Sequence, residues 1–214
     1  MGKIKDVIFD FGGVLVESNQ QQAAERFKKL GLKDADKRLD KYHQTGIFGD
    51  VEEGKIDSDG FINELEKLTG RKLTFDMCAY AWQGYCSGVP QRNLDLLKKL
   101  RKEGYRLCLL SNNNPFFMSW ARSKEFDGCG HSLDYYLDHI YLSYEMKMVK
   151  PDERIFKAVL SEEGISADEA MFIDDGERNI KSAAAIGIHT ILVKEGENWQ
   201  SELCKQLDEF KNKQ

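Results

Sequence analysis

Five short runs of apolar residues, each bounded by polar or turn-forming residues, predict the strands of this chain. They lie at 7–9, 107–110, 140–142, 171–173 and, more weakly, 190–193. Each run is too short for a helix, and continuous apolar runs of this length are typical of strands covered on both faces, as in a parallel sheet. We therefore expect a buried parallel sheet.

Between the later strands, apolar residues recur at helical spacing. Segment 92–104 places leucines on one face and ends at Gly104, and segments 151–164 and 179–186 follow the same pattern. An alternation of strand and helix predicts an α/β fold with right-handed crossovers and helices on both faces of the sheet.

Residues 18–88 interrupt this alternation. Four segments in this stretch have helical patterns, and no strand run separates them: 21–32, 34–48, 59–70 and 74–86. About 70 residues are too many for a loop, so we expect an inserted helical subdomain. Residues 1–17 and 89–214 would then form the core, joined to the insert at 18–88 by two short crossings near Glu17–Ser18 and Gly88–Val89.

The composition argues against some classes of binding partner and indicates the cellular compartment. The net charge is −5, with acidic and basic residues interspersed, and the absence of a basic stripe argues against nucleic acid as a partner. No apolar run approaches the roughly 18 residues of a membrane span. Five cysteines without a CxxC pair, and an N-terminus without an apolar signal region, favour a reduced, cytoplasmic protein. We expect a monomer.

Candidate chemistry gathers where the predicted strands end, which is where parallel α/β sheets bind ligands. The residues following the strands are Asp10-Phe11-Gly12-Gly13, Ser111-Asn112, Lys147 to Pro151, and Asp174-Asp175. Three aspartates together need a cation, and Mg²⁺ prefers carboxylate oxygens. A hydroxyl, amides and a lysine suit phosphate oxygens. The set predicts a metal-assisted phosphoryl site.

Four stretches, DFGGVLV, LLSNNN, KP and FIDDGERN, resemble in order the four motifs of the haloacid dehalogenase superfamily. The resemblance covers nearly the whole chain and is closest to the small sugar-phosphate phosphatase branch. It implies a Rossmann-like core with a helical cap between the first and second motifs. It also implies a Mg²⁺-dependent phosphatase that hydrolyses a small phosphorylated metabolite, such as a sugar phosphate, through an aspartyl-phosphate.

The resemblance also implies roles for the residues that react with and hold the phosphoryl group. Asp10 matches the nucleophile. Ser111 matches the hydroxyl that binds the phosphoryl group, with Asn112 beside it. Lys150 matches the lysine that neutralises both the nucleophile and the phosphate.

A second set of roles concerns the metal. Asp10, the backbone carbonyl of Gly12 and Asp175 match the magnesium ligands, and Asp174 matches a neighbouring ligand or a partner of the ligands. Asn179 matches the last polar position of the fourth motif, where other members often have an acid.

Gly12 departs from the family pattern. Most phosphatases of this family have an aspartate at the second position after the nucleophile, where it protonates the leaving alcohol and then activates water. Loss of a general acid and base costs about 10²–10⁴ in rate. A cap residue, a water or a substrate hydroxyl are the candidates to replace it.

Two alternatives remain open beside the phosphatase. The first is a metal-independent 2-haloacid dehalogenase, because dehalogenases of this family also lack the second acid. The pair Asp174-Asp175 argues against it, since it indicates a metal. The second is a catalytically weak binding or regulatory protein, against which the intact nucleophile, lysine and paired acids argue.

Cap residues should determine specificity, and three of them are candidates to face the substrate: His43, Phe48 and Glu52. The remaining histidines (His131, His139, His189) and the tryptophans (Trp82, Trp120, Trp199) are interpreted as structural or packing residues. Cap closure should exclude water while Asp10 attacks.

Overall fold

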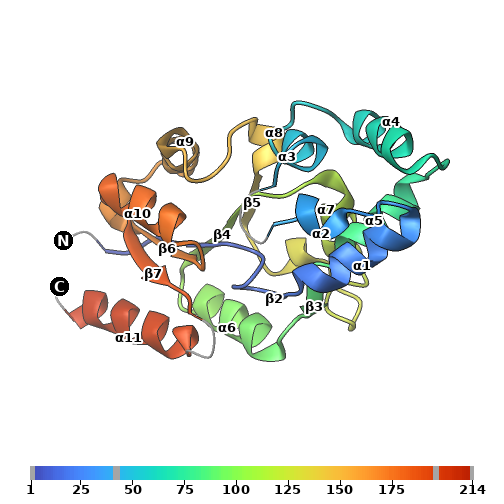
Figure 1. Ribbon diagram of the computed structural model, residues 1–214. Coiled ribbons are helices and arrows are strands. Elements are labelled where there is room, and N and C mark those ends of the chain that lie inside the picture. Colours follow the sequence, from blue (N-terminus) through green and yellow to red (C-terminus); the bar gives the residue numbers. More distant parts are fainter. Residues whose placement is uncertain (1–2, 41–43, 195–197, 213–214) are drawn as a thin grey trace.

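A five-stranded parallel sheet forms the centre of the computed structural model, which describes residues 3–40, 44–194 and 198–212. In spatial order the strands are β5 (His139–Leu142), β4 (Arg106–Ser111), β1 (Asp6–Phe9), β6 (Ala170–Asp174) and β7 (His189–Leu192) (Figure 1). Four of the predicted apolar runs lie within these strands, and the fifth, 190–193, matches β7 except for Val193, which follows the strand. The expected α/β fold class is confirmed.

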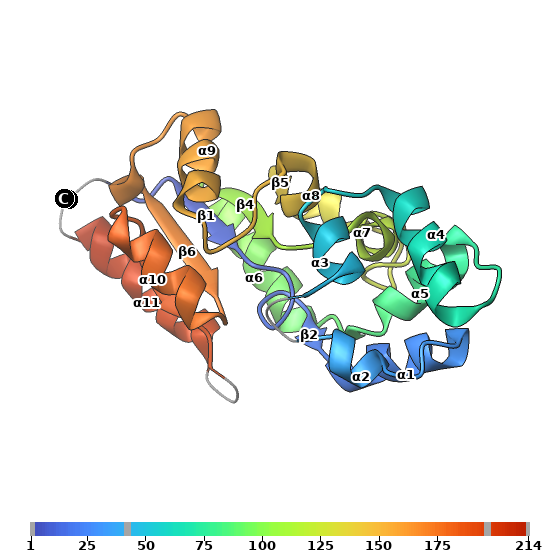
Figure 2. The same ribbon diagram turned by 45° about the horizontal axis from the view of Figure 1, so that its top comes forward.

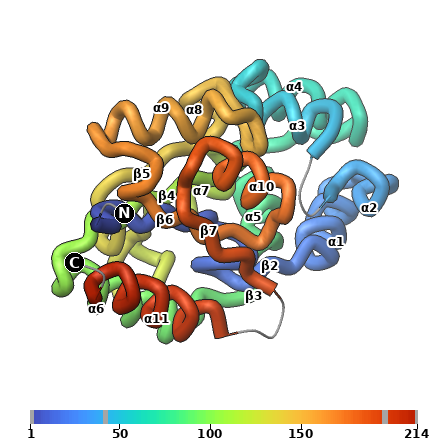
Figure 3. Tube along the Cα trace, turned by 90° about the vertical axis from the view of Figure 1, so that its left-hand side faces the viewer, coloured from blue at the N-terminus to red at the C-terminus, as the bar shows by residue number. Residues whose placement is uncertain are grey.

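Both faces of the sheet are covered by helices, which explains the continuous apolar runs. Along β1, Val7 and Phe9 pack into the layer that contains α6 (Gln91–Lys102) and α11 (Trp199–Asn212). Ile8 points into the opposite layer, with α9 (Glu153–Glu163) and α10 (Glu177–Ala185). Figures 1 and 3 show α9 and α10 on one side of the sheet and α6 and α11 on the other.

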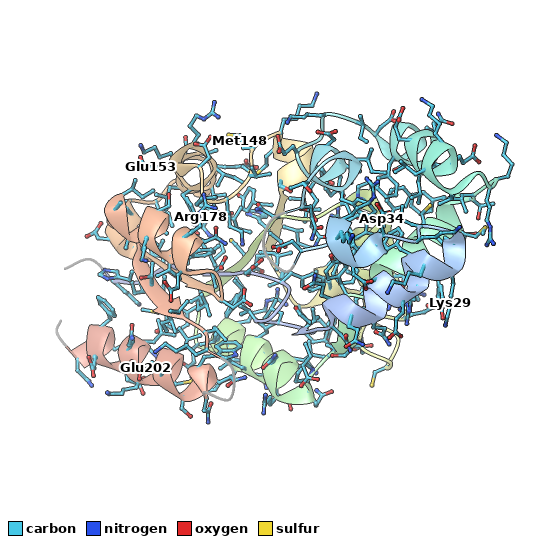
Figure 4. All side chains as sticks on the ribbon, in the orientation of Figure 1. Lys29, Asp34, Met148, Glu153, Arg178 and Glu202 are labelled. Atoms are coloured by element: carbon cyan, nitrogen blue, oxygen red, sulfur yellow. The ribbon has the colours of Figure 1, made fainter. Side chains whose placement is uncertain are left out.

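Five helices between β1 and β4 form a second body, which we call the cap. They are α1 (Gln20–Leu30), α2 (Ala35–Arg38), α3 (Ile47–Glu52), α4 (Ser58–Thr69) and α5 (Phe75–Gln83), grouped on the right of Figures 1 and 2. In Figure 4, Lys29 and Asp34 lie on this body and Arg178 lies on α10 of the core. The insert is helical, as predicted, whereas its exact boundaries at 18–88 stay a prediction.

A cluster of aromatic rings fills the interior of the cap. Phe48 lies with its ring centroid 5.2 Å from that of Phe27 and 5.3 Å from that of Phe61, both edge-on. Trp82 packs against the same rings, 5.6 Å from Phe27. Edge-on contacts of this kind add to the stabilisation from burial, so the cap has an aromatic core of its own.

The cap differs from the sequence prediction in two places. Segment 34–48 is not one helix: α2 ends at Arg38 and is followed by Leu39, whose backbone is extended, and α3 begins after Gly46, which has φ +58°. Also, β2 (Glu17–Ser18) and β3 (Cys86–Gly88) pair as short antiparallel strands at the two crossings, where no strand was predicted. His43 lies outside the described residues.

The core reaches the cap through two further helices. α7 (Pro115–Ala121) packs against α5, and α8 (Ser143–Met146) packs against α3. Short 3₁₀ turns at Leu133–Tyr135 and Ala167–Glu169 complete the described elements. None of the helices in the described ranges has the length and apolar character that crossing a bilayer requires.

Candidate active site

The predicted site residues come together at the carboxyl end of the sheet. They line a cavity of about 100 Å³, roofed by cap residues. The core residues around it include Asp10, Gly12, Ser111, Asn112, Lys150, Asp175 and Asn179. Segments more than 160 residues apart in the sequence therefore meet because β1, β4 and β6 are neighbours in one parallel sheet.

Lys150 is the central cation of the site. Its ammonium lies 2.9 Å from Asp10 Oδ1 and 2.6 Å from Asp174 Oδ2, and its side chain is 1% exposed. Burial favours loss of its proton, but the two carboxylates outweigh burial and raise the pKa of Lys150. The lysine is therefore charged and held between two acids.

Asn112 fixes the loop that carries this lysine. Its side-chain amide donates to the Lys150 carbonyl (2.9 Å), and its side-chain oxygen accepts from the Lys150 backbone N–H (2.8 Å). These two bonds join the end of β4 to the loop before α9. Asn112 thus positions Lys150 besides lining the cavity.

Asp174 is fully buried and bound on both oxygens. Its Oδ1 accepts from the Gly176 backbone N–H (2.7 Å), and the Asn179 amide donates to both oxygens (3.0 and 3.1 Å). Its Oδ2 also accepts from Lys150. This geometry suits a residue that orients Lys150 and borders the metal site.

The three aspartates at this edge fit a divalent cation. One carboxylate oxygen each of Asp10, Asp174 and Asp175 lie within 4.8 Å of one another. Burial, together with the charges of Asp174 and Asp175, raises the pKa of Asp10, while Lys150 opposes the rise. A hard cation with oxygen ligands would relieve this repulsion.

The turn after β1 brings the backbone close to Asp175. Gly13 has φ +77°, and a Cβ at this position would lie 2.8 Å from Asp175 Cγ and closer still to Oδ2. Only glycine fits both the left-handed backbone and the close approach. Gly13 thus lets the end of β1 and the end of β6 share one site.

Ser111 and its neighbours form the side of the cavity next to β4. Ser111 is buried, and its hydroxyl accepts from the Asn113 side-chain amide at 3.4 Å. The backbone N–H of Asn113 donates to Ser143 Oγ (3.0 Å). The end of β4 is thereby joined to the start of α8.

Gly12 lines the cavity but offers only its backbone. A Cβ there would lie 3.1 Å from Ser18 Oγ, so the direction in which an acid at this position would extend leads to the hydroxyl of Ser18. Because residue 12 is glycine, the core has no carboxyl group at the position where most phosphatases of the family that the sequence resembles carry their acid.

The cap contributes several cavity residues, only one of which was a candidate from the sequence. Glu52 lines the cavity, as do Gln44, Trp82 and Tyr85. Phe48 instead packs within the aromatic cluster. Nothing in the sequence pattern distinguishes Gln44 or Tyr85, because their position depends on how the cap helices fold over the strand ends.

Comparison with known proteins gives three findings. The profile of the haloacid dehalogenase-like hydrolases matches residues 4–187. A D-ribitol-5-phosphate phosphatase of Bacteroides thetaiotaomicron is 46% identical over 96% of this chain and 99% of its own length. A HAD family enzyme of the same species, bt-2542, solved with magnesium and inorganic phosphate, has a TM-score of 0.83 at 37% identity, covering 94% of this chain and 98% of its own.

Other solved structures agree on the fold. A HAD-like family hydrolase from Porphyromonas gingivalis has a TM-score of 0.89 and 35% identity over 96% of this chain and 98% of its own. The L-2-haloacid dehalogenase RSc1362 reaches a TM-score of 0.61 at 17% identity over 97% of this chain and 100% of its own, a likeness of fold alone. The predicted family and hydrolase class are confirmed. The chain belongs to the haloacid dehalogenase-like hydrolases.

Proposed function

We propose that this chain is a Mg²⁺-dependent phosphatase that hydrolyses a small sugar phosphate or polyol phosphate through an aspartyl-phosphate on Asp10. One observation carries the proposal: a buried lysine lies between Asp10 and Asp174, beside three clustered carboxylates and at the wall of a small cavity. A phosphoryl group and a divalent cation together would balance this arrangement of charges.

Asp10 is the nucleophile in this proposal. Its carboxylate oxygen attacks phosphorus, the bond from phosphorus to the leaving oxygen breaks, and the phosphoryl group becomes attached to Asp10. Lys150, 2.9 Å from Asp10 Oδ1, stabilises the negative charge that spreads over the phosphoryl oxygens. Ser111 and Asn112, at the end of β4, line the place where these oxygens would lie.

The metal ligands of the proposal are Asp10, the carbonyl of Gly12 and Asp175, with Asp174 bordering them. Mg²⁺, when bound, supplies charge neutralisation for the phosphoryl oxygens. Asp174 holds Lys150 against the nucleophile, because its own oxygens are bound to Lys150, Gly176 and Asn179. The relative solved with magnesium and inorganic phosphate supports a magnesium ion at this site.

The indole N–H of Trp82, in the cap, is evidence for a substrate that carries hydroxyl groups. Trp82 is 1% exposed and lines the cavity, and within the described part of the chain its indole N–H has no acceptor. A buried N–H without a partner costs about 1–3 kcal/mol, which a substrate hydroxyl would recover. The relative that acts on D-ribitol 5-phosphate supports a polyol or sugar phosphate.

Phosphate release from a panel of polyol and sugar phosphates, including D-ribitol 5-phosphate, tests the proposal. Release should require both Mg²⁺ and Asp10, so EDTA and Asp10→Asn should each abolish it. Halide release from 2-haloacids without a metal would favour the dehalogenase alternative instead. No Asp10-dependent turnover with either class would favour the binding protein.

We further propose a monomer in a reducing compartment such as the cytoplasm. All five cysteines are free thiols, and Cys78 and Cys108 are buried, which suits a reducing environment. Size-exclusion chromatography tests the monomer, and fractionation of cells tests the location.

A further inference from the structure

The cap places a carboxyl group in the cavity where the core lacks its usual acid. Among the described residues that line this cavity, Glu52 is the acid that the cap contributes. We infer that Glu52 is the general acid and base of the reaction, in the role that Gly12 cannot fill. The inference rests on the proposed phosphatase function and adds a catalytic residue to it.

Glu52 is held in place from the core side. It is the last residue of α3, and its backbone carbonyl accepts from Ser143 Oγ at 2.6 Å. The same hydroxyl accepts from the backbone N–H of Asn113, two residues after Ser111. A chain of hydrogen bonds therefore joins the end of β4 to the residue that carries the carboxyl group.

A close backbone approach supports the same placement. Gly54 has φ +65°, and a Cβ there would lie 3.2 Å from the carbonyl carbon of Tyr144 and closer still to its oxygen. The turn after α3 therefore lies directly on α8, and Figures 1 and 2 show these two helices side by side. Glu52 is thus on the part of the cap that is seated on the core.

The other groups around the cavity are less suited to move a proton. Asp10 is the nucleophile, and Asp174 is bound on both oxygens. Lys150 is held charged by two carboxylates. Burial raises the pKa of Tyr85 above its usual range, so its hydroxyl is a weaker acid than a free tyrosine.

The protonation state of Glu52 agrees with the role. Burial, and then the negative charges of Asp10 and Glu53, raise the pKa of Glu52 to about 8. A bound cation would reduce the contribution of Asp10, but burial is the largest cause and would remain. Near neutral pH the carboxyl group is then protonated and able to donate, as a general acid must be.

The two half-reactions balance with one proton. In the first, neutral Glu52 gives its proton to the leaving alkoxide oxygen as the Asp10–phosphorus bond forms, and Glu52 becomes a carboxylate. In the second, this carboxylate takes a proton from water as the water oxygen attacks phosphorus. The Asp10–phosphorus bond breaks, inorganic phosphate leaves, and Glu52 is protonated again.

The test compares leaving groups in the variant Glu52→Gln, with Glu53→Gln as the matched control. Glu53 is adjacent in the chain, and its carboxylate pairs with Lys55 at 2.6 Å. The substrates are D-ribitol 5-phosphate, whose alcohol needs a proton to leave, and p-nitrophenyl phosphate, whose phenolate does not. Rapid mixing follows the burst of p-nitrophenolate, and acid quench measures the phosphorylated enzyme.

Glu52→Gln should lose about 10²–10⁴ in turnover of the polyol phosphate, without accumulating phosphorylated enzyme. With p-nitrophenyl phosphate it should keep a burst of about one equivalent and then stall as phosphorylated enzyme, because the second half-reaction lacks its base. Glu53→Gln removes the smallest of the causes that raise the pKa of Glu52, and burial, the largest cause, stays; at neutral pH it should therefore keep near-wild-type turnover of both substrates. A merely structural role for Glu52 would slow both bursts alike.

Each remaining outcome is decisive. If the wild type releases no phosphate from either substrate, the proposed function fails and the inference fails with it. If the wild type is active and Glu52→Gln matches Glu53→Gln on both substrates, only the inference fails. Should Glu52→Gln unfold, Glu52→Asp keeps a carboxyl group one methylene shorter and should continue to release p-nitrophenolate after the burst. A burst followed by no further release would overturn the inference.

Discussion

Gly13→Ala tests whether the close approach of the first turn to Asp175 sets the geometry of the metal site. Gly13 has φ +77°, and an added Cβ would lie 2.8 Å from Asp175 Cγ and closer to Oδ2. Since Cβ contacts under 3.0 Å essentially never occur, the carboxylate of Asp175 has to withdraw. The substitution therefore combines a backbone penalty with a displaced candidate metal ligand.

Gly104→Ala is the matched control, because it carries the backbone penalty alone. Gly104 has φ +89°, and a Cβ there would meet nothing within 4 Å in the described structure. A left-handed backbone costs a residue other than glycine about 1–2 kcal/mol. For a chain of this size that corresponds to a fall in Tm of about 2–4 °C per kcal/mol, which both variants should show.

The two variants should separate on magnesium and on turnover. Mg²⁺ that binds only the folded state raises Tm, and this rise should shrink in Gly13→Ala but persist in Gly104→Ala. Misplacement of a positioned group by about 1 Å can cost about 10²-fold in rate, so phosphate release should fall by 10- to 100-fold, roughly, in Gly13→Ala only. Thermal melts with Mg²⁺ or EDTA and a phosphate assay measure both quantities. Equal magnesium responses and equal turnover in the two variants would refute the reasoning.

Three further predictions follow from the same contacts. Lys150→Met leaves buried carboxylates without their cation and should lower the free energy of unfolding by about 3–5 kcal/mol; urea denaturation with a stability equal to wild type would contradict this. EDTA should lower the Tm of the wild type measured with Mg²⁺, because it removes the cation that offsets the repulsion among Asp10, Asp174 and Asp175. Asp10→Asn should show a smaller fall in scanning fluorimetry, and an equal fall would argue against Asp10 as a ligand. Gly54→Ala should push α3 away from Tyr144. It should slow turnover of the polyol phosphate more than the burst of p-nitrophenolate from p-nitrophenyl phosphate; equal slowing of both would contradict the idea that this turn positions Glu52.

The sheet was predictable because burial on both faces leaves a continuous apolar signal. β1, β4 and β6 lie in the middle of the sheet, and every residue of β1 and β6 is buried. The strand ends then identify the site edge without further information, since parallel strands bring their carboxyl ends together. Asp10, Ser111 and Asp175 meet for that reason, as expected.

The cap was less predictable because its breaks are local backbone events. Segment 34–48 has the composition of a helix, yet Leu39 is extended and Gly46 takes φ +58° before α3. The paired strands at Glu17–Ser18 and Cys86–Gly88 are too short to show any periodicity. Their pairing depends on two segments about 70 residues apart in the chain meeting in space.

Apart from Glu52, which was a candidate from the sequence, the cavity residues of the cap carry no signal in the sequence. Trp82 was interpreted as a packing residue, and it does pack on Phe27, but it also lines the cavity, and its indole N–H has no acceptor among the residues that the structure describes. Glu52 is one of two adjacent glutamates, and only the fold distinguishes it from Glu53, which pairs with Lys55. Positions of this kind become visible only when the cap is placed over the strand ends.

Supplying the acid from the cap would couple the chemistry to cap closure. An acid at residue 12 would belong to the core and would face the phosphoryl group whether or not the cap is seated. Glu52 belongs to α3, and the bond from Ser143 to its carbonyl exists only while α3 lies on α8. Protonation of the leaving group and activation of water would then both wait for closure, when bulk water is excluded. With Gly12 in the core, the acid is supplied only when α3 lies on α8. A substrate that prevents this contact would reach Asp10 without an acid to protonate its leaving group, so the enzyme would select among substrates by whether they allow the cap to close.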